Sequence, residues 1–227
     1  ILARFNTAQP HRILLAAHWD TRPWADNDPD PDNRNRPLPG ANDGASGVAV
    51  LLEIARLIGE NAPATGVDIL LLDCEDAGNH SDDYSWGLGA QYFAQNLPYT
   101  DSDRPSYGIL LDMVGDPAAR FYREYVSQRY ARQVNDRIFD IARMSGFDNY
   151  FIDEIGGAVT DDHTFLNRAG IPTADIIDCT NALTGSFPRS WHTMADDLNA
   201  ISPQTLHAVG QTVANIIYSE PIQSQSK

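Results

Sequence analysis

Two adjacent acids, Glu75 and Asp76, follow an apolar run that has the character of a β-strand. Buried carboxylates at a strand end are costly unless a cation or a proton-transfer task accounts for them. Two distant segments offer further donors, because Asp43 lies in a strand-to-helix turn and His192 lies in a late loop. Two aspartates and a histidine with a fourth position open are typical of a catalytic zinc. We therefore predict that Asp43, Asp76 and His192 bind one zinc. Glu75, which the zinc does not need as a ligand, is then free to move protons.

Each of these motifs has an ordinary alternative when it is taken alone. The Asn-Asp-Gly context of Asp43 usually marks only a turn. The acid pair also fits a solvent-facing strand end, and His192 fits a hydrogen-bonded loop histidine. All three segments fall where an α/β sheet gathers its site, and this combination favours metal binding.

The composition excludes several classes of protein. A length of 227 residues suits one catalytic domain over residues 1–227 with a sizeable core. The net charge of −15 argues against nucleic-acid and anionic-membrane partners, because both require basic patches. The sequence has no apolar stretch near the ~20 residues of a membrane-spanning segment. Cys74 and Cys179 each end an apolar run, so we expect buried free thiols, with a single bridge as the alternative.

The elements that must position these residues alternate between strands and helices. Apolar runs predict strands at residues 1–6, 12–18, 67–73, 107–113 and 172–178. Apolar spacing and capping residues predict helices at residues 44–60, 88–96, 127–144, 161–169 and 203–218. Gln9-Pro10 predicts a hairpin turn between the first two strands. This order predicts an α/β three-layer sandwich, in which helices flank a mixed, mostly parallel sheet with an antiparallel hairpin at one edge.

In such a sheet, ligands collect at the carboxyl ends of the parallel strands. His18, the Glu75-Asp76 pair and Asp112 all follow predicted strands, so we expect them to converge. The proline-rich segment 19–39 is predicted to be a turn-rich surface loop. Its alternating aspartates mimic a calcium loop, but prolines stand where that loop needs glycine and glutamate.

The motifs, taken in order, resemble the zinc-dependent exopeptidase family, which includes two-zinc aminopeptidases and glutaminyl-peptide cyclotransferases. The segments that carry the resemblance are His18-Trp-Asp20, Gly40–Gly47, Asp73–Asp76, Leu111-Asp112, Asp161-Asp-His163 and Trp191–Met194. The resemblance covers nearly the whole chain. It implies the α/β fold of that family, a zinc cofactor, peptide substrates and a periplasmic or secreted location.

Several positions are similar to the cyclotransferase branch, and to its bacterial members in particular. Asp161 stands where the aminopeptidases typically carry serine, and Trp191 precedes His192 as in the cyclotransferases. Two positions depart from the animal enzymes. Asp76 replaces a glutamate ligand, and Trp86 follows later than the tryptophan of the animal pocket. The role of Trp86 therefore stays open between the pocket wall and packing.

The resemblance implies conversion of N-terminal glutaminyl residues of peptides to pyroglutamate, with one zinc per chain. Glu75 would then transfer protons, and Asp161 and Asp112 would form an acidic network with it that shares at least one proton. Trp191 and Phe187 would form the pocket wall.

Two alternatives remain open. His18 and Asp112 occupy positions that hold the second zinc in the aminopeptidases, so a two-zinc aminopeptidase is the first alternative. A catalytically inactive relative that serves as a binding module is the second, and the competent residues at every ligand position argue against it. The other histidines are predicted to lie outside the metal site: His11, His80, His163 and His207.

Overall fold

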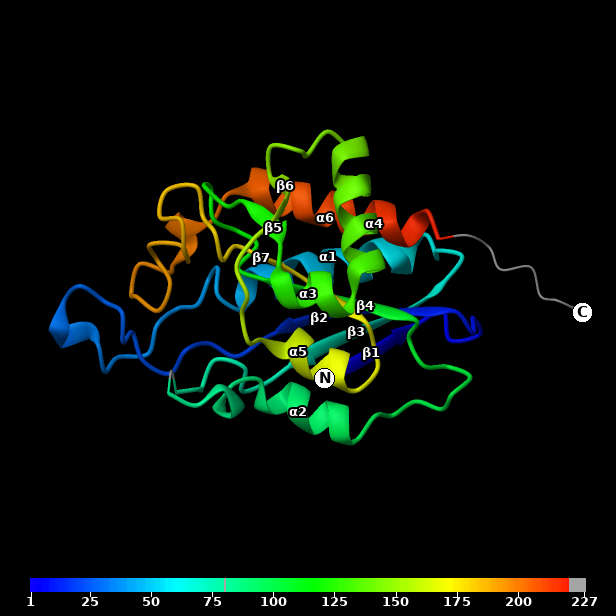
Figure 1. Cartoon of the computed structure of the whole chain (residues 1–227), viewed down its shortest axis with the longest axis horizontal. Coiled ribbons are helices and arrows are strands. Elements are labelled where there is room, and N and C mark those ends of the chain that lie inside the picture. Colours follow the sequence, from blue (N-terminus) through cyan, green and yellow to red (C-terminus); the bar gives the residue numbers. More distant parts are fainter. Residues whose placement is uncertain (80, 221–227) are drawn as a thin grey trace, which may run out of the picture.

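A computed structural model describes residues 1–79 and 81–220, so His80 lies outside the described residues (Figure 1). The strands are β1 (Leu2–Phe5), β2 (Arg12–His18), β3 (Gly66–Leu72), β4 (Tyr107–Asp112), β5 (Phe121–Arg123), β6 (Phe151–Ile155) and β7 (Thr173–Ile177). The α-helices are α1 (Ala45–Glu60), α2 (Leu88–Gln95), α3 (Tyr125–Tyr130), α4 (Arg132–Met144), α5 (Asp162–Arg168) and α6 (Pro203–Tyr218). Short 3-10 helices span Pro31–Asn33, Asp83–Ser85 and Leu198–Ala200.

The main sheet has five strands in the order β1-β3-β2-β4-β7. β2, β3, β4 and β7 run parallel, and β1 lies antiparallel at one edge. The predicted fold class is therefore confirmed, but the predicted hairpin is wrong. β1 pairs with β3, where Leu2 lies opposite Leu70, instead of with β2. Strand β3 is largely buried, and its place between β1 and β2 pairs its backbone on both sides, which an edge position would not.

Helices cover both faces of this sheet (Figure 1). On one face, α1, α4 and α6 pack against strand residues such as Leu15, Ile69 and Leu111. On the other face, α2 and α5 pack against Ala16, Leu110 and their neighbours. Successive residues of one strand thus enter opposite cores, as the alternation of a β-strand requires.

Two parts of the secondary structure differ from the sequence prediction. The single helix predicted over residues 127–144 is two helices, which meet at the buried residue Ala131. This break lets α3 pack on β7 while α4 packs on α6. The two-stranded parallel sheet of β5 and β6 was not predicted, because both strands are too short to give a clear alternation.

Several other predictions concern single residues. Both cysteines are free thiols, but Cys74 is exposed and Cys179 is only half-buried, so the prediction that both are buried is wrong. Cys74 lies in the turn after β3, beyond the buried residues of the strand. Among the described residues, none of the helices is long and apolar enough to cross a membrane.

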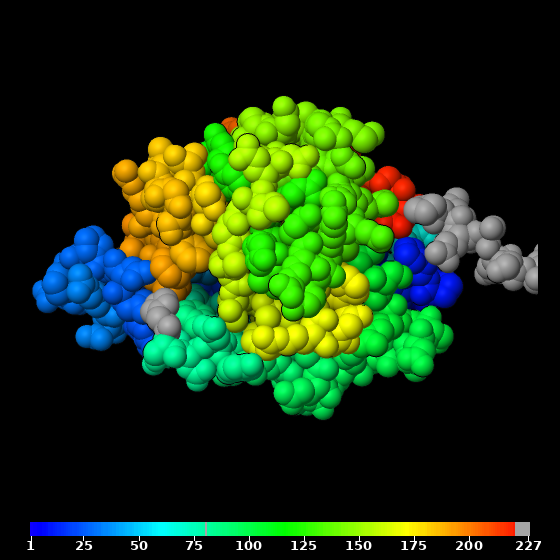
Figure 2. Space-filling view, viewed as in Figure 1, coloured from blue at the N-terminus to red at the C-terminus, as the bar shows by residue number. Residues whose placement is uncertain are grey.

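The carboxyl ends of β2, β3, β4 and β7 open toward one end of the molecule. The 19–39 loop, in blue, projects there beside the orange segment that precedes α6 (Figure 2). The loops at this end carry most of the predicted site residues.

Candidate metal centre

The first group of donors is the one predicted from the sequence. Asp43 lies in the turn before α1, Asp76 follows β3, and His192 lies in the loop between β7 and α6. Their donor atoms all lie within 4.8 Å of one another, and all three side chains are buried. His192 Nε2 is 3.0 Å from Asp76 Oδ1 and 3.6 Å from Asp43 Oδ2. These three residues, drawn from distant parts of the chain, can therefore face one ion.

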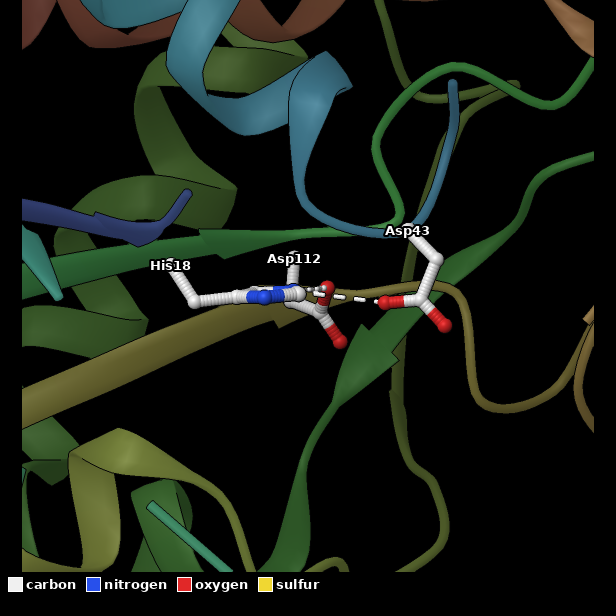
Figure 3. Close-up of side chains that lie close together, drawn as sticks. All are labelled: His18, Asp43 and Asp112. Atoms are coloured by element: carbon white, nitrogen blue, oxygen red, sulfur yellow. Dashed lines mark hydrogen bonds and ion pairs between the residues drawn. The ribbon is translucent and has the colours of Figure 1, made fainter. Parts of the chain in front are cut away.

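A second group shares Asp43 with the first. His18 ends β2 and Asp112 ends β4, and His18 Nε2 lies 3.0 Å from Asp112 Oδ1 and 3.3 Å from Asp43 Oδ1 (Figure 3). The three donors again lie within 4.8 Å of one another and are buried. The two oxygens of Asp43 thus face different histidines, and the geometry offers a second position beside the first.

Two further aspartates hold the backbone of these segments. Asp20 accepts the N–H groups of Glu75 and Asp76, each at 3.1 Å. Asp196 accepts the N–H groups of Asn42 and Asp43, at 2.8 and 3.0 Å. Sequence reasoning assigned no role to either aspartate, and only their nearness to the motifs could have indicated one. Each aspartate thereby fixes the backbone of a candidate metal-ligating residue, and so the direction from which its side chain enters the site.

Three residues other than glycine adopt the left-handed backbone conformation at this end of the sheet. They are Cys74, Met113 and His192, with φ values of 55°, 48° and 56°. Such residues are uncommon and cluster at functional sites. Cys74 precedes Glu75 and Met113 follows Asp112, so the strand ends bend sharply at the acids that face the pocket.

The carboxylates are crowded, which shifts their protonation. Burial and the nearby Asp161 raise the pKa of Glu75 well above its usual range. Burial and Asp43 raise the pKa of Asp76 to about 6, against the hydrogen bond of His192. Burial raises the pKa of Asp112 to about 8, although the hydrogen bond of His18 opposes the shift. Asp112 thus has a hydrogen bond to His18, and repulsion from Asp161 adds to the rise in the pKa of Asp112. This arrangement agrees only in part with the predicted acidic network.

A pocket of 420 Å³ opens over these groups. All nine predicted site residues line it: Asp43, Glu75, Asp76, Trp86, Asp112, Asp161, Phe187, Trp191 and His192. Their roles stay predictions, but the structure brings the residues together. This placement includes Trp86, whose position the sequence left open.

The aromatic side of the pocket is a stack. The ring of Trp191 lies 4.0 Å from that of His192 and 4.2 Å from that of Phe187, measured between centroids. Trp86 lies parallel to His192 at 6.4 Å. The pocket therefore combines aromatic rings with acidic side chains.

The donors fit a divalent cation. Oδ2 of Asp43 and Oδ2 of Asp76 are buried and accept no hydrogen bond from the described residues. Buried anionic oxygens without donors are costly, and a cation removes that cost. A mixed set of carboxylate oxygens and an imidazole nitrogen is one that zinc accepts.

Comparison with known proteins agrees with this geometry. A profile of peptidase family M28 matches residues 1–217. The chain belongs to peptidase family M28. Its buried donor groups are consistent with the zinc-dependent enzymes of that family.

Three solved structures show how similar the relatives are. The glutaminyl cyclase of Bacteroides thetaiotaomicron, bound to N-acetylhistamine, is 45% identical with a TM-score of 0.92, over 97% of this chain and 77% of that one. The Tannerella forsythia glutaminyl cyclase is 42% identical with a TM-score of 0.91, over 97% and 77%. A leucine aminopeptidase precursor from B. thetaiotaomicron is 44% identical with a TM-score of 0.90, over 97% and 76%.

The chain is thus similar to bacterial glutaminyl cyclases of this family, and a structure named as an aminopeptidase is equally similar. The chain spans about half the length of the curated relatives that it matches. Family membership therefore supports a zinc-dependent enzyme, and the reaction is a separate question.

Proposed function

We propose that this protein converts N-terminal glutaminyl residues of peptides to pyroglutamate and releases ammonia. The observation that carries the proposal is the composition of the pocket. Two buried acids, Glu75 and Asp161, line the same pocket as the stacked rings of Trp191 and Phe187 and the candidate metal donors. The identity of 45% to a bacterial glutaminyl cyclase supports the same conclusion.

Asp43, Asp76 and His192 would hold one zinc in this proposal. When bound, zinc supplies Lewis-acid polarisation of an amide carbonyl. The aromatic wall holds the glutaminyl side chain folded back toward its own α-amine, and this positioning supplies a large share of the rate enhancement.

Glu75 moves the proton in this reaction. The α-amine forms a bond to the side-chain amide carbon, and the bond from that carbon to the amide nitrogen breaks. Glu75 takes a proton from the attacking amine and gives it to the leaving nitrogen, which departs as ammonia. A carboxyl whose pKa burial and Asp161 raise well above the usual range suits both halves of this transfer.

Asp161 and Asp112 support that transfer. Asp161 accepts a hydrogen bond from the nitrogen of the tetrahedral intermediate and raises the proton affinity of Glu75 by repulsion. Asp112, which is hydrogen-bonded to His18 and whose pKa burial raises to about 8, holds a proton of this acidic network. The reaction needs no water as nucleophile, and this separates it from peptide hydrolysis.

Incubation of the full chain with a glutamine-leading peptide tests the proposal by mass analysis. We expect a product lighter by one ammonia. The same peptide with an acetylated α-amine is the matched control, because it has no nucleophile and must stay unchanged. Release of a free amino acid from the unblocked peptide would overturn the proposal.

One observation favours a second candidate, a two-zinc aminopeptidase. His18, Asp43 and Asp112 form a complete second donor group, and Asp43 could bridge two ions. Metal analysis separates the two candidates, because about one zinc per chain is expected for cyclisation and about two for hydrolysis.

A further inference from the structure

The 19–39 loop is predicted from its sequence to be a surface loop, but its residues 22–28 contact the segments that carry the metal donors. The N–H of Asn27 donates to the carbonyl of His192 at 3.1 Å. The N–H of Met194 donates to Oδ2 of Asp28 at 2.9 Å, and Asp28 is buried. The loop is therefore fastened to the segment that carries His192.

Arg22 is the centre of this contact and is only 2% exposed. Its Nη2 donates to Oδ2 of Asp26 at 2.7 Å, and its Nε donates to Oδ1 of the same carboxylate at 3.3 Å. Its Nη1 donates to the backbone carbonyls of Asp76 at 2.9 Å and of Gly78 at 2.7 Å. One guanidinium thus connects the carboxylate of Asp26 to the backbone of a candidate ligand.

Asp26 in turn faces the second nitrogen of His192. Its Oδ1 lies 3.4 Å from Nδ1 of the ring, while Nε2 of the same ring faces Asp76 and Asp43. A carboxylate on one ring nitrogen fixes the tautomer and the orientation in which the other nitrogen meets a metal.

The same guanidinium also supports the pocket wall. It lies between two tryptophan rings, with its central carbon 5.0 Å from the centroid of Trp24 and 5.1 Å from that of Trp86. Trp86 lines the pocket, so Arg22 touches the wall and the ligands together. Arginine suits this position, because a planar fork can stack and bond at once, and lysine cannot.

We propose that Arg22 and Asp26 are positioning residues that set the zinc affinity of the site and link it to the position of Trp86. The inference rests on the zinc site of the proposed function. Neither residue donates to the metal. Asp26 aligns the His192 ring, and Arg22 holds both Asp26 and the backbone of Asp76.

Zinc affinity of the full chain, measured by competition with a chromophoric chelator and without substrate, tests this inference. Asp26→Asn and Arg22→Lys should each weaken zinc binding about 10- to 100-fold, the size of effect seen when such partners of a ligand are removed. The matched control is Asp32→Asn, which removes a charge from an exposed position in the same loop and should leave the affinity unchanged.

The thermal unfolding midpoint of each metal-free variant separates positioning from a loss of fold. Asp26→Asn should unfold at the parental temperature and still bind zinc more weakly. Parental affinity in Asp26→Asn would overturn the inference, and so would an equal loss in Asp32→Asn. A parental protein that binds zinc but fails to cyclise peptides would overturn the proposed reaction and leave this inference standing.

Discussion

Two histidines in this protein lie in similar surroundings and differ in what they can do. His192 and His163 are both buried, and each lies between carboxylates. His192 Nδ1 is 3.4 Å from Asp26, and its Nε2 is 3.0 Å from Asp76. His192 also forms part of the pocket wall, so an ion or a substrate can reach it.

His163, on α5, is enclosed. Its Nε2 is 3.1 Å from Oε2 of Glu124, and its Nδ1 is 3.4 Å from Oδ2 of Asp175. Glu124 already accepts three backbone N–H groups and the hydroxyl of Ser127, which fix the start of α3. Burial and the nearby Asp161 raise the pKa of Asp175 well above its usual range.

The comparison shows that donor proximity alone does not define a metal centre. Asp161, His163 and Asp175 also lie within 4.8 Å of one another. A metal site needs, in addition, an entry path for the ion. His192 lines the pocket, whereas His163 contacts Glu124, a carboxylate that already accepts several other hydrogen bonds, and is not among the described residues that line the pocket. The surroundings of His163, with Glu124 and Asp175 as its partners, favour a structural role, and its place outside the metal site stays a prediction.

The largest expected effect comes from replacing each of these two histidines with alanine in turn. His192→Ala should abolish zinc retention and turnover and leave the fold intact, because it removes a ligand at the pocket surface. His163→Ala should keep zinc and lower the free energy of unfolding by about 3–5 kcal/mol, because it leaves buried carboxylates unpaired. Zinc content and urea unfolding measure the two effects. Zinc loss in folded His163→Ala would erase the distinction between the two centres.

The next largest effect is expected at Glu75, the proposed proton-transfer acid. Glu75→Gln should lower kcat by roughly 10²- to 10⁴-fold, because the amide cannot carry the proton. Zinc content and the unfolding midpoint should not change. Exposed Glu154→Gln is the charge-matched control. Substantial activity in Glu75→Gln would transfer the role of the base to another residue.

A smaller loss is expected at Asp161. Asp161→Asn should reduce kcat by about 100-fold, the size of effect produced by removing one group that stabilises a transition state. Asp162→Asn is the matched control, because Asp162 is the neighbouring buried acid and is not among the described residues that line the pocket. Steady-state kinetics on the glutamine-leading peptide measures both. Equal effects would show that neither position is special and would favour the aminopeptidase.

The smallest effect is the pH dependence of stability that arises at Glu124, the partner of the enclosed His163. Burial acts to raise the pKa of Glu124, but hydrogen bonds from His163 and from backbone N–H groups lower it from 4.5 to about 2. Because the folded pKa is depressed, the resulting stability is present above pH 4.5 and is lost as the pH falls toward 2. It amounts to roughly 3 kcal/mol. The free energy of unfolding, measured by urea unfolding between these pH values, should rise with pH in the parental protein and rise less steeply in Glu124→Gln. Parallel slopes in the two proteins would contradict the assignment.

Much of the fold follows from apolar periodicity. Long elements such as α1, β3 and α6 were predicted within a few residues, because their apolar pattern is regular and, for α6, because Ser202 and Pro203 mark its start. The pairing of β1 was not predictable from Gln9-Pro10, since its partner lies more than 60 residues away and is chosen by burial of β3. Local turn signals cannot report a competition of that kind.

The candidate site likewise has residues that the sequence predicted and residues that it did not. Acids at strand ends converge because parallel strands share an edge, and this rule placed Glu75, Asp76 and Asp112 correctly in the pocket. Arg22, Asp26 and Asp20 were missed, because they act through contacts with backbone groups and with a histidine ring of distant loops. Turn-forming residues have the same composition whether they face solvent or a ligand, so the sequence gives no signal that separates the two cases.

The left-handed backbone at Cys74, Met113 and His192 has a consequence for how long the protein stays active on warming. Each such residue costs about 1–3 kcal/mol, which surrounding contacts must offset. The sheet beneath carries no cost of this kind. On warming, the catalytic end should therefore lose its shape before the sheet unfolds, and catalytic half-life will be shorter than circular dichroism suggests. Efforts to prolong the working life of this protein should reinforce the loops around these three bends and leave the central strands alone.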